Sequence, residues 1–252
     1  DWYCLPVTYI GHVDFYRPSW LDAAGIDVPE TYVEFADAVR TVGDWAQDEY
    51  GDTAYGAIYV GGTQDAINFY RTLMYSQGKK VLEDGEYQFD SPESRRAFGL
   101  MVDLATEGYV PPDHLSYAWG DAGRFFGIGN AGFMNAIQPS YITVYQRGEF
   151  EAVQGDVEVF APLKWDSSSP DSYVGRGVVG SNSMLINDAI SDAQKAAVML
   201  FADFVRSREG QRNEVIVEGN ESGLLYLWDH LDEELDLVDW EMAARVADEL
   251  NI

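Results

Sequence analysis

The stretch from Glu107 to Tyr141 constrains the fold more than any other part of the chain. A helix is expected to end at Gly108, and after a double proline a new helix is expected to begin around Asp121. A pair of glycines ends that helix, and the apolar run Ala131–Ile137 is then typical of a buried strand. The strand runs directly into the turn Gln138–Tyr141. This order predicts an α/β unit that presents amide, hydroxyl and aromatic groups at the end of a strand.

The same alternation of helices and strands runs through the rest of the chain. Helix starts are marked by the capping box Thr31–Glu34 and by Ser91-Pro92-Glu93, a cap followed by proline and an acid. Further strands are expected at Thr53–Val60 and Val178–Ile186. The pattern therefore indicates an α/β fold class.

Two helices carry apolar residues at the three- and four-residue spacing of a buried face. The helix from Thr31 to about Tyr50 is expected to bury Val33, Phe35, Ala36, Val39, Val42 and Ala46. The helix from Ser191 to Arg206 is expected to bury Ala193, Ala196, Ala197, Leu200, Phe201 and Phe204.

The chain is strongly acidic, with 43 acidic residues, 16 basic residues and a net charge of −27 over 252 residues. No stripe of basic residues runs along it, and like charges repel, so the charge disfavours a nucleic-acid partner and we expect none. The acids are spread out and indicate a hydrated, self-repelling surface that stays soluble in high salt. We therefore expect a halophilic source, where a screening length of about 3 Å at 1 M salt removes much of the repulsion.

Motifs for cofactors and metals are weak. Gly127–Gly132 fits G-x-G-x-x-G, but the expected helix precedes it and the strand follows, which is the reverse of a dinucleotide site. The three histidines, His12, His114 and His230, are too far apart in sequence for a histidine metal motif. Cys4 is the only cysteine, so an internal disulfide or a cysteine cluster is excluded. We expect no cofactor and no metal.

Catalytic motifs are equally scarce. The G-x-S-x-G elbow of serine hydrolases is absent. A pair of glycosidase carboxylates could be chosen anywhere among 43 acids, so the sequence does not single out a glycosidase active site. No apolar run approaches the roughly 18–20 residues of a membrane span. The chain opens on Asp1-Trp2-Tyr3 without a start methionine or signal peptide, so we expect a partial or trimmed product.

Polar and aromatic residues gather where the expected strands and helices begin or end. Together they predict one site that holds a polar ligand by hydrogen bonds and ring contacts. The candidate ligand-binding residues are Thr8, Tyr9, Gln64, Asp65, Asn68, Gln138, Ser140, Tyr141, Gly180, Ser181 and Asn182.

Four segments, in this order, resemble the extracellular solute-binding proteins (family 1) of ABC importers, the class that includes maltose and trehalose binders. They are Leu5–Val39 (LPVTYIGHVDFYRPSW and onward), Phe69–Asp113, the stretch from Glu107 to Tyr141, and Val178–Gln211 (VVGSNSMLINDAISDAQKAAVMLF and onward). The resemblance implies a periplasmic-binding-protein-like fold of type II, in which two α/β lobes joined by hinge strands close on a ligand.

The resemblance also implies a division of the chain. Relatives have about a hundred more N-terminal residues, which form most of the first lobe, so this chain is expected to hold mostly the second lobe plus a return segment of the first. Residues 1–10 would be a hinge strand, 11–162 the first part of lobe two, 163–218 the return segment of lobe one, and 219–252 the C-terminal helices of lobe two.

The function that the resemblance implies is the extracellular, cell-surface component of an ABC importer that binds a carbohydrate and hands it to a membrane permease as a monomer, without catalysis. All eleven candidate residues fall at ligand-contact positions of the family. Two departures affect the ligand: Ile10 stands where several sugar binders have an acid, and Tyr141 is the only ring in a turn that often carries tryptophan. Two alternatives remain open, a carboxylate-dependent glycoside hydrolase and an acidic non-catalytic interaction module.

Overall fold

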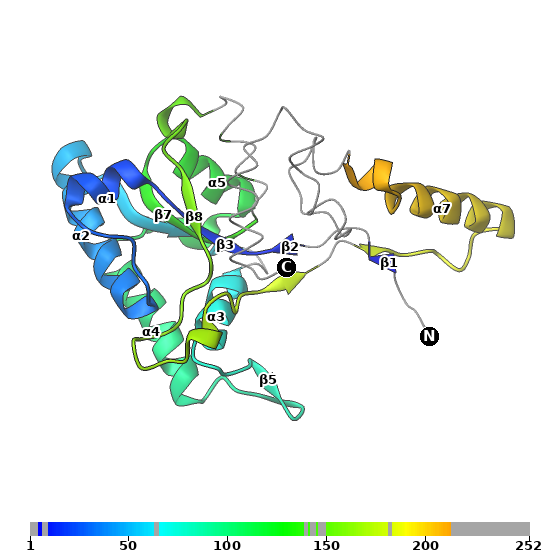
Figure 1. The fold of residues 1–252 in the computed structure, drawn as a ribbon, viewed down its shortest axis with the longest axis horizontal. Helices are drawn as coiled ribbons and strands as arrows, with labels where there is room; N and C mark the ends of the chain where they lie inside the picture. The colour runs from blue at the N-terminus through cyan, green and yellow to red at the C-terminus, as the bar shows by residue number, and fades with distance from the viewer. Residues whose placement is uncertain are drawn as a thin grey trace.

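The structure is a computed structural model that describes residues 5–6, 10–62, 66–138, 141, 145, 150–180 and 183–212. Within these residues, no helix combines the length and apolar character that crossing a membrane requires. Helices and strands are mixed, as the sequence predicted (Figure 1).

A four-stranded sheet forms the centre of the molecule. Its order is β4 (Tyr55–Tyr59), β7 (Ala131–Ile137), β3 (Val13–Tyr16) and β8 (Glu158–Phe160). β7 runs parallel to β4 and antiparallel to β3, and β3 is antiparallel to β8. Every residue of β7 is buried, which confirms the apolar run Ala131–Ile137 as an inner strand.

The helices begin and end close to the predicted positions. Thr31, Ser91 and Ser191 each accept a hydrogen bond from the backbone N–H three residues later. The caps predicted at Thr31 and Ser91 are confirmed, and Ser191, the expected start of a helix, is a third cap. Gly25 closes the first helix in the left-handed conformation, at φ 71°. The helices are α1 (Pro18–Ala24), α2 (Tyr32–Tyr50), α3 (Ala66–Tyr75), α4 (Pro92–Thr106), α5 (Trp119–Gly127) and α7 (Asp192–Val205), with a small hairpin of β5 (Leu82–Glu83) and β6 (Glu86–Tyr87) between α3 and α4.

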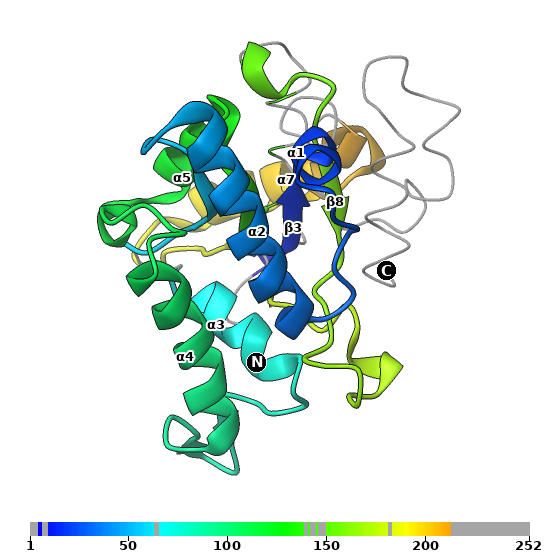
Figure 2. The ribbon, with the colours of Figure 1, turned by 90° about the vertical axis from the view of Figure 1, so that its left-hand side faces the viewer.

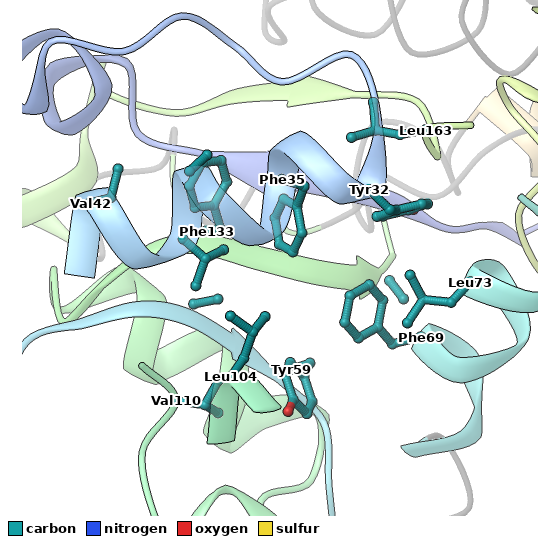
Figure 3. Packing of buried hydrophobic residues seen from close by; sticks show 14 of the residues in the cluster. Tyr32, Phe35, Val42, Tyr59, Phe69, Leu73, Leu104, Val110, Phe133 and Leu163 are labelled. Carbon is teal, nitrogen blue, oxygen red and sulfur yellow. The ribbon is translucent and has the colours of Figure 1, made fainter. Parts of the chain in front are cut away.

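The sheet separates two apolar cores because successive strand residues point to opposite faces. In β4, Ala57 and Tyr59 belong to the core under α2, α3 and α4, whereas Ile58 belongs to the core under α5. Figure 3 shows the first core, in which Phe35 of α2 lies against Phe133 of β7, with their ring centres 5.2 Å apart. In Figure 2, α2 runs obliquely beside β3.

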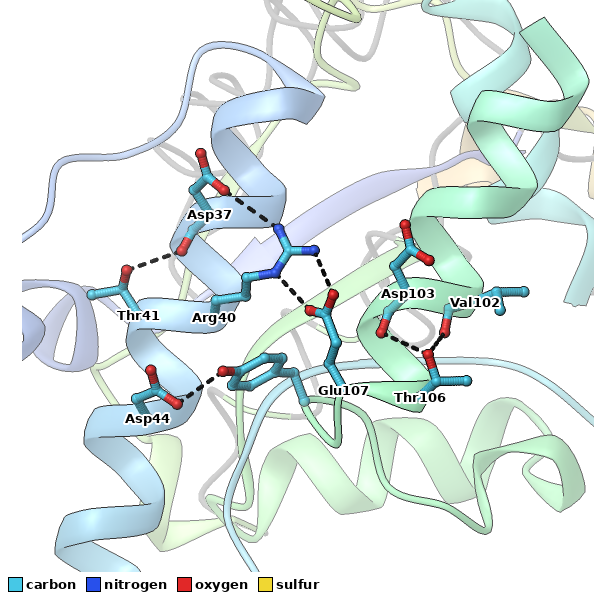
Figure 4. A network of polar contacts seen from close by, with 9 residues as sticks. Asp37, Arg40, Thr41, Asp44, Val102, Asp103, Thr106 and Glu107 are labelled. Carbon is cyan, nitrogen blue, oxygen red and sulfur yellow. Dashed lines mark hydrogen bonds and ion pairs between the residues drawn. The ribbon is translucent and has the colours of Figure 1, made fainter. Parts of the chain in front are cut away.

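Polar contacts at the surface tie α2 to the end of α4 (Figure 4). Arg40 donates to both carboxylate oxygens of Glu107, at 2.7 and 3.2 Å, and the Tyr109 hydroxyl donates to Asp44 at 3.0 Å. The groups of this network are partly exposed, so we assign it at most about 1 kcal/mol of stability.

The start of the chain crosses a later segment in two short antiparallel pairs. β1 (Leu5–Pro6) pairs with β10 (Ser183–Met184), and β2 (Ile10–Gly11) pairs with β9 (Val179–Gly180). We call these two pairs the strand crossing. It lies between the central sheet and α7, which projects away from the other helices (Figure 1).

Two expectations about buried faces were wrong. Val33 in α2 is exposed, because the buried stripe follows Phe35, Val39, Val42 and Ala46 on the other side of the helix. In α7 the whole predicted face is exposed, with Leu200 at 72%, Phe201 at 57% and Phe204 at 49%, and the one residue described as buried is Ala202. The amphipathic pattern was read correctly as a helix, but no described element packs on its apolar face.

Candidate functional site

His12 lies at the junction of the strand crossing, α3 and α5. It is buried, and its Nδ1 is 2.9 Å from the carbonyl oxygen of Val178, the residue before β9. On the other side of the ring, Nε2 is 3.5 Å from Nδ2 of Asn68. The ring also lies on Trp119, with centres 5.5 Å apart at an interplanar angle of 31°. One imidazole therefore contacts three separate segments of the chain.

Asn68 is held in the first turn of α3. Its carbonyl oxygen accepts a hydrogen bond from Thr72 Oγ1 at 3.0 Å, so the backbone is fixed within the helix. Its side chain is 6% exposed, and Nδ2 faces His12. Among the described residues, none donates a hydrogen bond to Oδ1 of Asn68. That oxygen is the acceptor that this side chain can offer to a ligand.

Tyr141 and Trp119 form the aromatic side of the site. The Tyr141 hydroxyl donates to the carbonyl oxygen of Trp119 at 2.8 Å. Its ring lies so close to α5 that a Cβ added at Gly123 would meet the ring at 1.9 Å. Burial, with a smaller contribution from the charge of Asp121, raises the pKa of Tyr141, so the phenol stays protonated and donates. Both side chains are half-buried, which leaves ring surface accessible.

Gln138 and Gly180 complete the arrangement through strand pairing. Val13 pairs with Ile137, so the antiparallel register sets His12 beside Gln138. Gly180 pairs with Ile10, two residues before His12. We call this group the crossing cluster; its members are His12, Asn68, Trp119, Gln138, Tyr141 and Gly180.

The structure describes four of the eleven candidate residues, and it places them near His12 or Trp119; their role in ligand binding stays a prediction. They come from α3, the end of β7 and β9, which are far apart in the sequence. The other seven candidates lie outside the described residues and remain predictions: Thr8, Tyr9, Gln64, Asp65, Ser140, Ser181 and Asn182.

Two residues of the crossing cluster, His12 and Trp119, are not among the ligand-binding candidates predicted from the sequence. His12 was considered only as a metal ligand, although it follows directly after the expected hinge strand. Trp119 stands at the start of a helix, where polar and aromatic residues had been singled out elsewhere, so the same rule applied to it would have found it. Among the described residues, no group of three or more histidine, cysteine or acidic side chains could hold a metal ion.

A buried carboxyl lies in the core below the cluster. Asp14 of β3 accepts hydrogen bonds from the backbone N–H of Ala136 at 2.7 Å and from the Tyr32 hydroxyl at 3.1 Å. Burial raises the pKa of Asp14 to about 6, and these hydrogen bonds only partly offset it. The bond to Ala136 holds a left-handed residue at φ 50°, beside an irregularity in the pairing of β3 with β7. Asp14 therefore shapes the strand end that carries Gln138.

A hollow lies between α3 and α4, and its lining includes Ile67, the residue before Asn68. This α3–α4 groove has a volume of about 750 Å³ and is lined by apolar and aromatic side chains such as Ile67, Tyr70, Phe98 and Val102. Its few polar groups are already used, since the Tyr70 hydroxyl is bonded to Ser94 Oγ at 2.7 Å. A polar ligand needs several convergent hydrogen-bonding groups, so the groove suits such a ligand less well than the crossing cluster does.

The family model of the bacterial extracellular solute-binding proteins matches residues 1–212. The match covers most of the chain, so the protein belongs to this family. The family is one of solute-binding proteins, which agrees with the expectation of a binding role without catalysis. A search of curated proteins found no match to the sequence.

Solved structures of the same class resemble the fold. Maltose-bound MalE3 of T. maritima matches with a TM-score of 0.83 and 22% identity, covering 98% of this chain and 60% of that one. An ABC transporter solute-binding protein of Agrobacterium radiobacter K84 in complex with ribitol matches with a TM-score of 0.75 and 22% identity, covering 88% and 53%. One from Agrobacterium vitis S4 with D-mannitol has a TM-score of 0.75 and 20% identity, covering 99% and 58%.

These matches confirm the predicted periplasmic-binding-protein-like fold. The chain spans only 53–60% of the length of these three proteins. This coverage is consistent with the prediction that the relatives have additional N-terminal residues that this chain lacks.

Proposed function

We propose that the protein is the solute-binding component of an ABC importer and that its ligand is a carbohydrate, either a sugar or a polyol. The observation that carries this proposal is the crossing cluster, in which Asn68, Gln138, Tyr141 and Gly180 gather around His12 and Trp119. The resembling structures bind maltose, ribitol and D-mannitol, and these ligands share a row of hydroxyl groups.

The chemistry of the cluster fits such a ligand. Amides of Asn68 and Gln138 can each donate to or accept from a hydroxyl group. The rings of Trp119 and Tyr141 can pack against the apolar C–H face of a sugar. The six described residues of the cluster include no carboxylate or ammonium group, so we expect them to hold the ligand by hydrogen bonds and shape.

The strand crossing supplies the proposed hinge. Both crossing segments are short strand pairs, the kind of connection that can absorb a bend between two rigid bodies. In the proposed division, residues 1–10 are the hinge strand, 11–162 and 219–252 belong to lobe two, and 163–218 return to lobe one. Leu163 packs in the core with Tyr32, so we refine the proposed start of the return segment to β9 at Val179.

The remaining parts of the proposal follow from the family. The partner is the membrane permease of an ABC importer, the protein acts as a monomer, and it works at the outer cell surface. The net charge of −27 supports a halophilic source.

A ligand screen tests the proposal. We expect at least one of maltose, ribitol and D-mannitol to raise the temperature of thermal unfolding of the chain in about 1 M NaCl. The reason is that a ligand that binds only the folded state stabilises that state by mass action. The ligand must be recovered unchanged after incubation. Release of a shorter saccharide from maltose would favour the glycoside hydrolase, and no saturable binding to any carbohydrate would favour the acidic interaction module.

A further inference from the structure

The hydrogen bonds of His12 fix the orientation of a neighbouring amide. The carbonyl oxygen of Val178 can only accept, so the His12 nitrogen 2.9 Å from it, Nδ1, carries the hydrogen. In a neutral imidazole the other nitrogen, Nε2, then has a lone pair and accepts. Asn68 meets this acceptor with its amide nitrogen, Nδ2.

This contact determines the direction of the other amide atom of Asn68, the oxygen Oδ1. Because Nδ2 is turned toward His12, Oδ1 points away from it, and no described residue donates to that oxygen. Rotation of the amide by 180° would place Oδ1 against the lone pair of Nε2, which is repulsive. The backbone of Asn68 is anchored within α3, so its side chain has little freedom to compensate.

We infer that His12 is a positioning residue that makes Asn68 a hydrogen-bond acceptor for the ligand. This inference rests on the proposed function, since it assumes that Asn68 contacts the carbohydrate. It assigns the chemistry of one ligand position: the group that meets Asn68 donates a hydrogen bond, as a free hydroxyl does. A ligand with an ether oxygen or a methoxy group at that position would meet an unpaired acceptor and bind less tightly.

The same contacts connect ligand recognition to the strand crossing. His12 contacts Val178, the residue before β9, and Asn68 of α3, so a shift of the strand crossing would move the ring that orients the amide. Trp119 supports the face of that ring from α5. Oδ1 of Asn68 is therefore directed to the ligand only when the strand crossing and α3 both keep their contacts with His12.

The tautomer of His12 tests the inference without any ligand. Long-range ¹⁵N–¹H correlation spectra of the labelled chain, recorded at alkaline pH, are expected to show hydrogen on Nδ1 of His12 and none on Nε2. The signal is assigned by its disappearance in His12→Gln. Hydrogen on Nε2 would overturn the inference, because Asn68 would then have to turn its oxygen toward the ring.

Two isosteric substitutions give the second readout, in calorimetric titrations with D-mannitol or whichever of the three screened carbohydrates binds. Asn68→Asp keeps an acceptor facing the ligand, provided that Nε2 of His12 takes up a hydrogen and donates to the second carboxylate oxygen; affinity is then expected to stay within about threefold. Asn68→Leu removes the acceptor and is expected to cost about tenfold or more. Equal losses in both variants would overturn the inference. Unchanged affinity in both, with hydrogen still on Nδ1, would remove Asn68 from the site and so contradict the proposed function instead.

Discussion

At the scale of single residues, the sharpest consequence of burial concerns Asp14. Its carboxyl is enclosed between β3, β7 and α2, and its pKa is raised to about 6. The unfolded chain would titrate near the ordinary value of 3.8. Between these values the folded state holds the proton more tightly, so the contribution of Asp14 to the free energy of unfolding is largest at low pH and falls as pH rises toward 6.

Asp14→Asn removes this pH dependence, because asparagine mimics the protonated carboxyl and can still pair with Ala136 and Tyr32. We expect the variant to gain stability relative to the unmodified protein by roughly 3 kcal/mol between pH 4 and pH 7, from a difference of about two pKa units. Urea unfolding of both proteins at several pH values measures this difference. A constant difference across the range would show that Asp14 titrates normally.

Tyr141 depends on the absence of a side chain at Gly123. Alanine there places a Cβ where the Tyr141 ring now lies. We therefore expect Gly123→Ala to displace the ring and to weaken binding of a screened carbohydrate about tenfold, roughly the value of a lost aromatic contact. Calorimetric titration of the variant measures the loss.

Gly120→Ala is the matched control for this substitution. Gly120 lies in the same helix, α5, with nothing within 4 Å of an added Cβ. We expect normal binding in this variant and a slight gain in stability, because alanine favours helix over glycine. An equal loss of affinity in both variants would mean that the substitutions disturb helix α5 and not the position of the Tyr141 ring.

At the scale of elements, α7 differs from the other helices. Its apolar face, including Leu200 and Phe201, is exposed, so charged substitutions there remove no packing in this chain. We expect Phe201→Glu to change the free energy of unfolding by no more than about 0.5 kcal/mol and to reduce aggregation, which light scattering can follow. Ala202→Glu, at the buried position next to it, is expected to destabilise the helix packing. A large loss of stability in Phe201→Glu would show that this face is covered.

The elements also show how far sequence reasoning reaches. Helix caps at Thr31, Ser91 and Ser191 were predictable because they depend on a side chain and a backbone N–H three residues apart. The strand Ala131–Ile137 was predictable because a run of apolar residues is buried on both faces. The exposure of α7 was not predictable, because periodicity identifies an apolar face of a helix but does not show whether another element covers it.

The site was predictable only in part, for the same reason. Asn68, Gln138, Tyr141 and Gly180 stand at element ends, which the sequence marks, but their convergence depends on the order and register of the strands. His12 owes its role to contacts with Val178 and Asn68, which are 166 and 56 residues away in the chain. The buried position of Asp14 likewise follows from pairing between β3 and β7, for which the sequence carries no local signal.

At the scale of the whole molecule, charge sets the conditions for stability. A net charge of −27 repels itself, and raising NaCl from about 0.1 M to 1 M shortens the screening length from about 10 Å to about 3 Å. We expect the temperature of thermal unfolding to rise over this range. Titration with sodium sulfate, compared at equal ionic strength, separates screening from preferential exclusion of the salt. Greater stability at low salt would contradict the halophilic reading of the surface.

The central claim is that a carbohydrate binds at the crossing cluster and not in the α3–α4 groove. The most direct measurement is calorimetric titration of a carbohydrate that passes the screen into Trp119→Ala and Phe98→Ala, with folding checked by thermal unfolding. Trp119 stands in the cluster and Phe98, 61% exposed, in the groove. The expected result is one-to-one binding that is weakened about tenfold by Trp119→Ala and unchanged by Phe98→Ala. The reverse pattern would place the ligand in the groove and contradict the account.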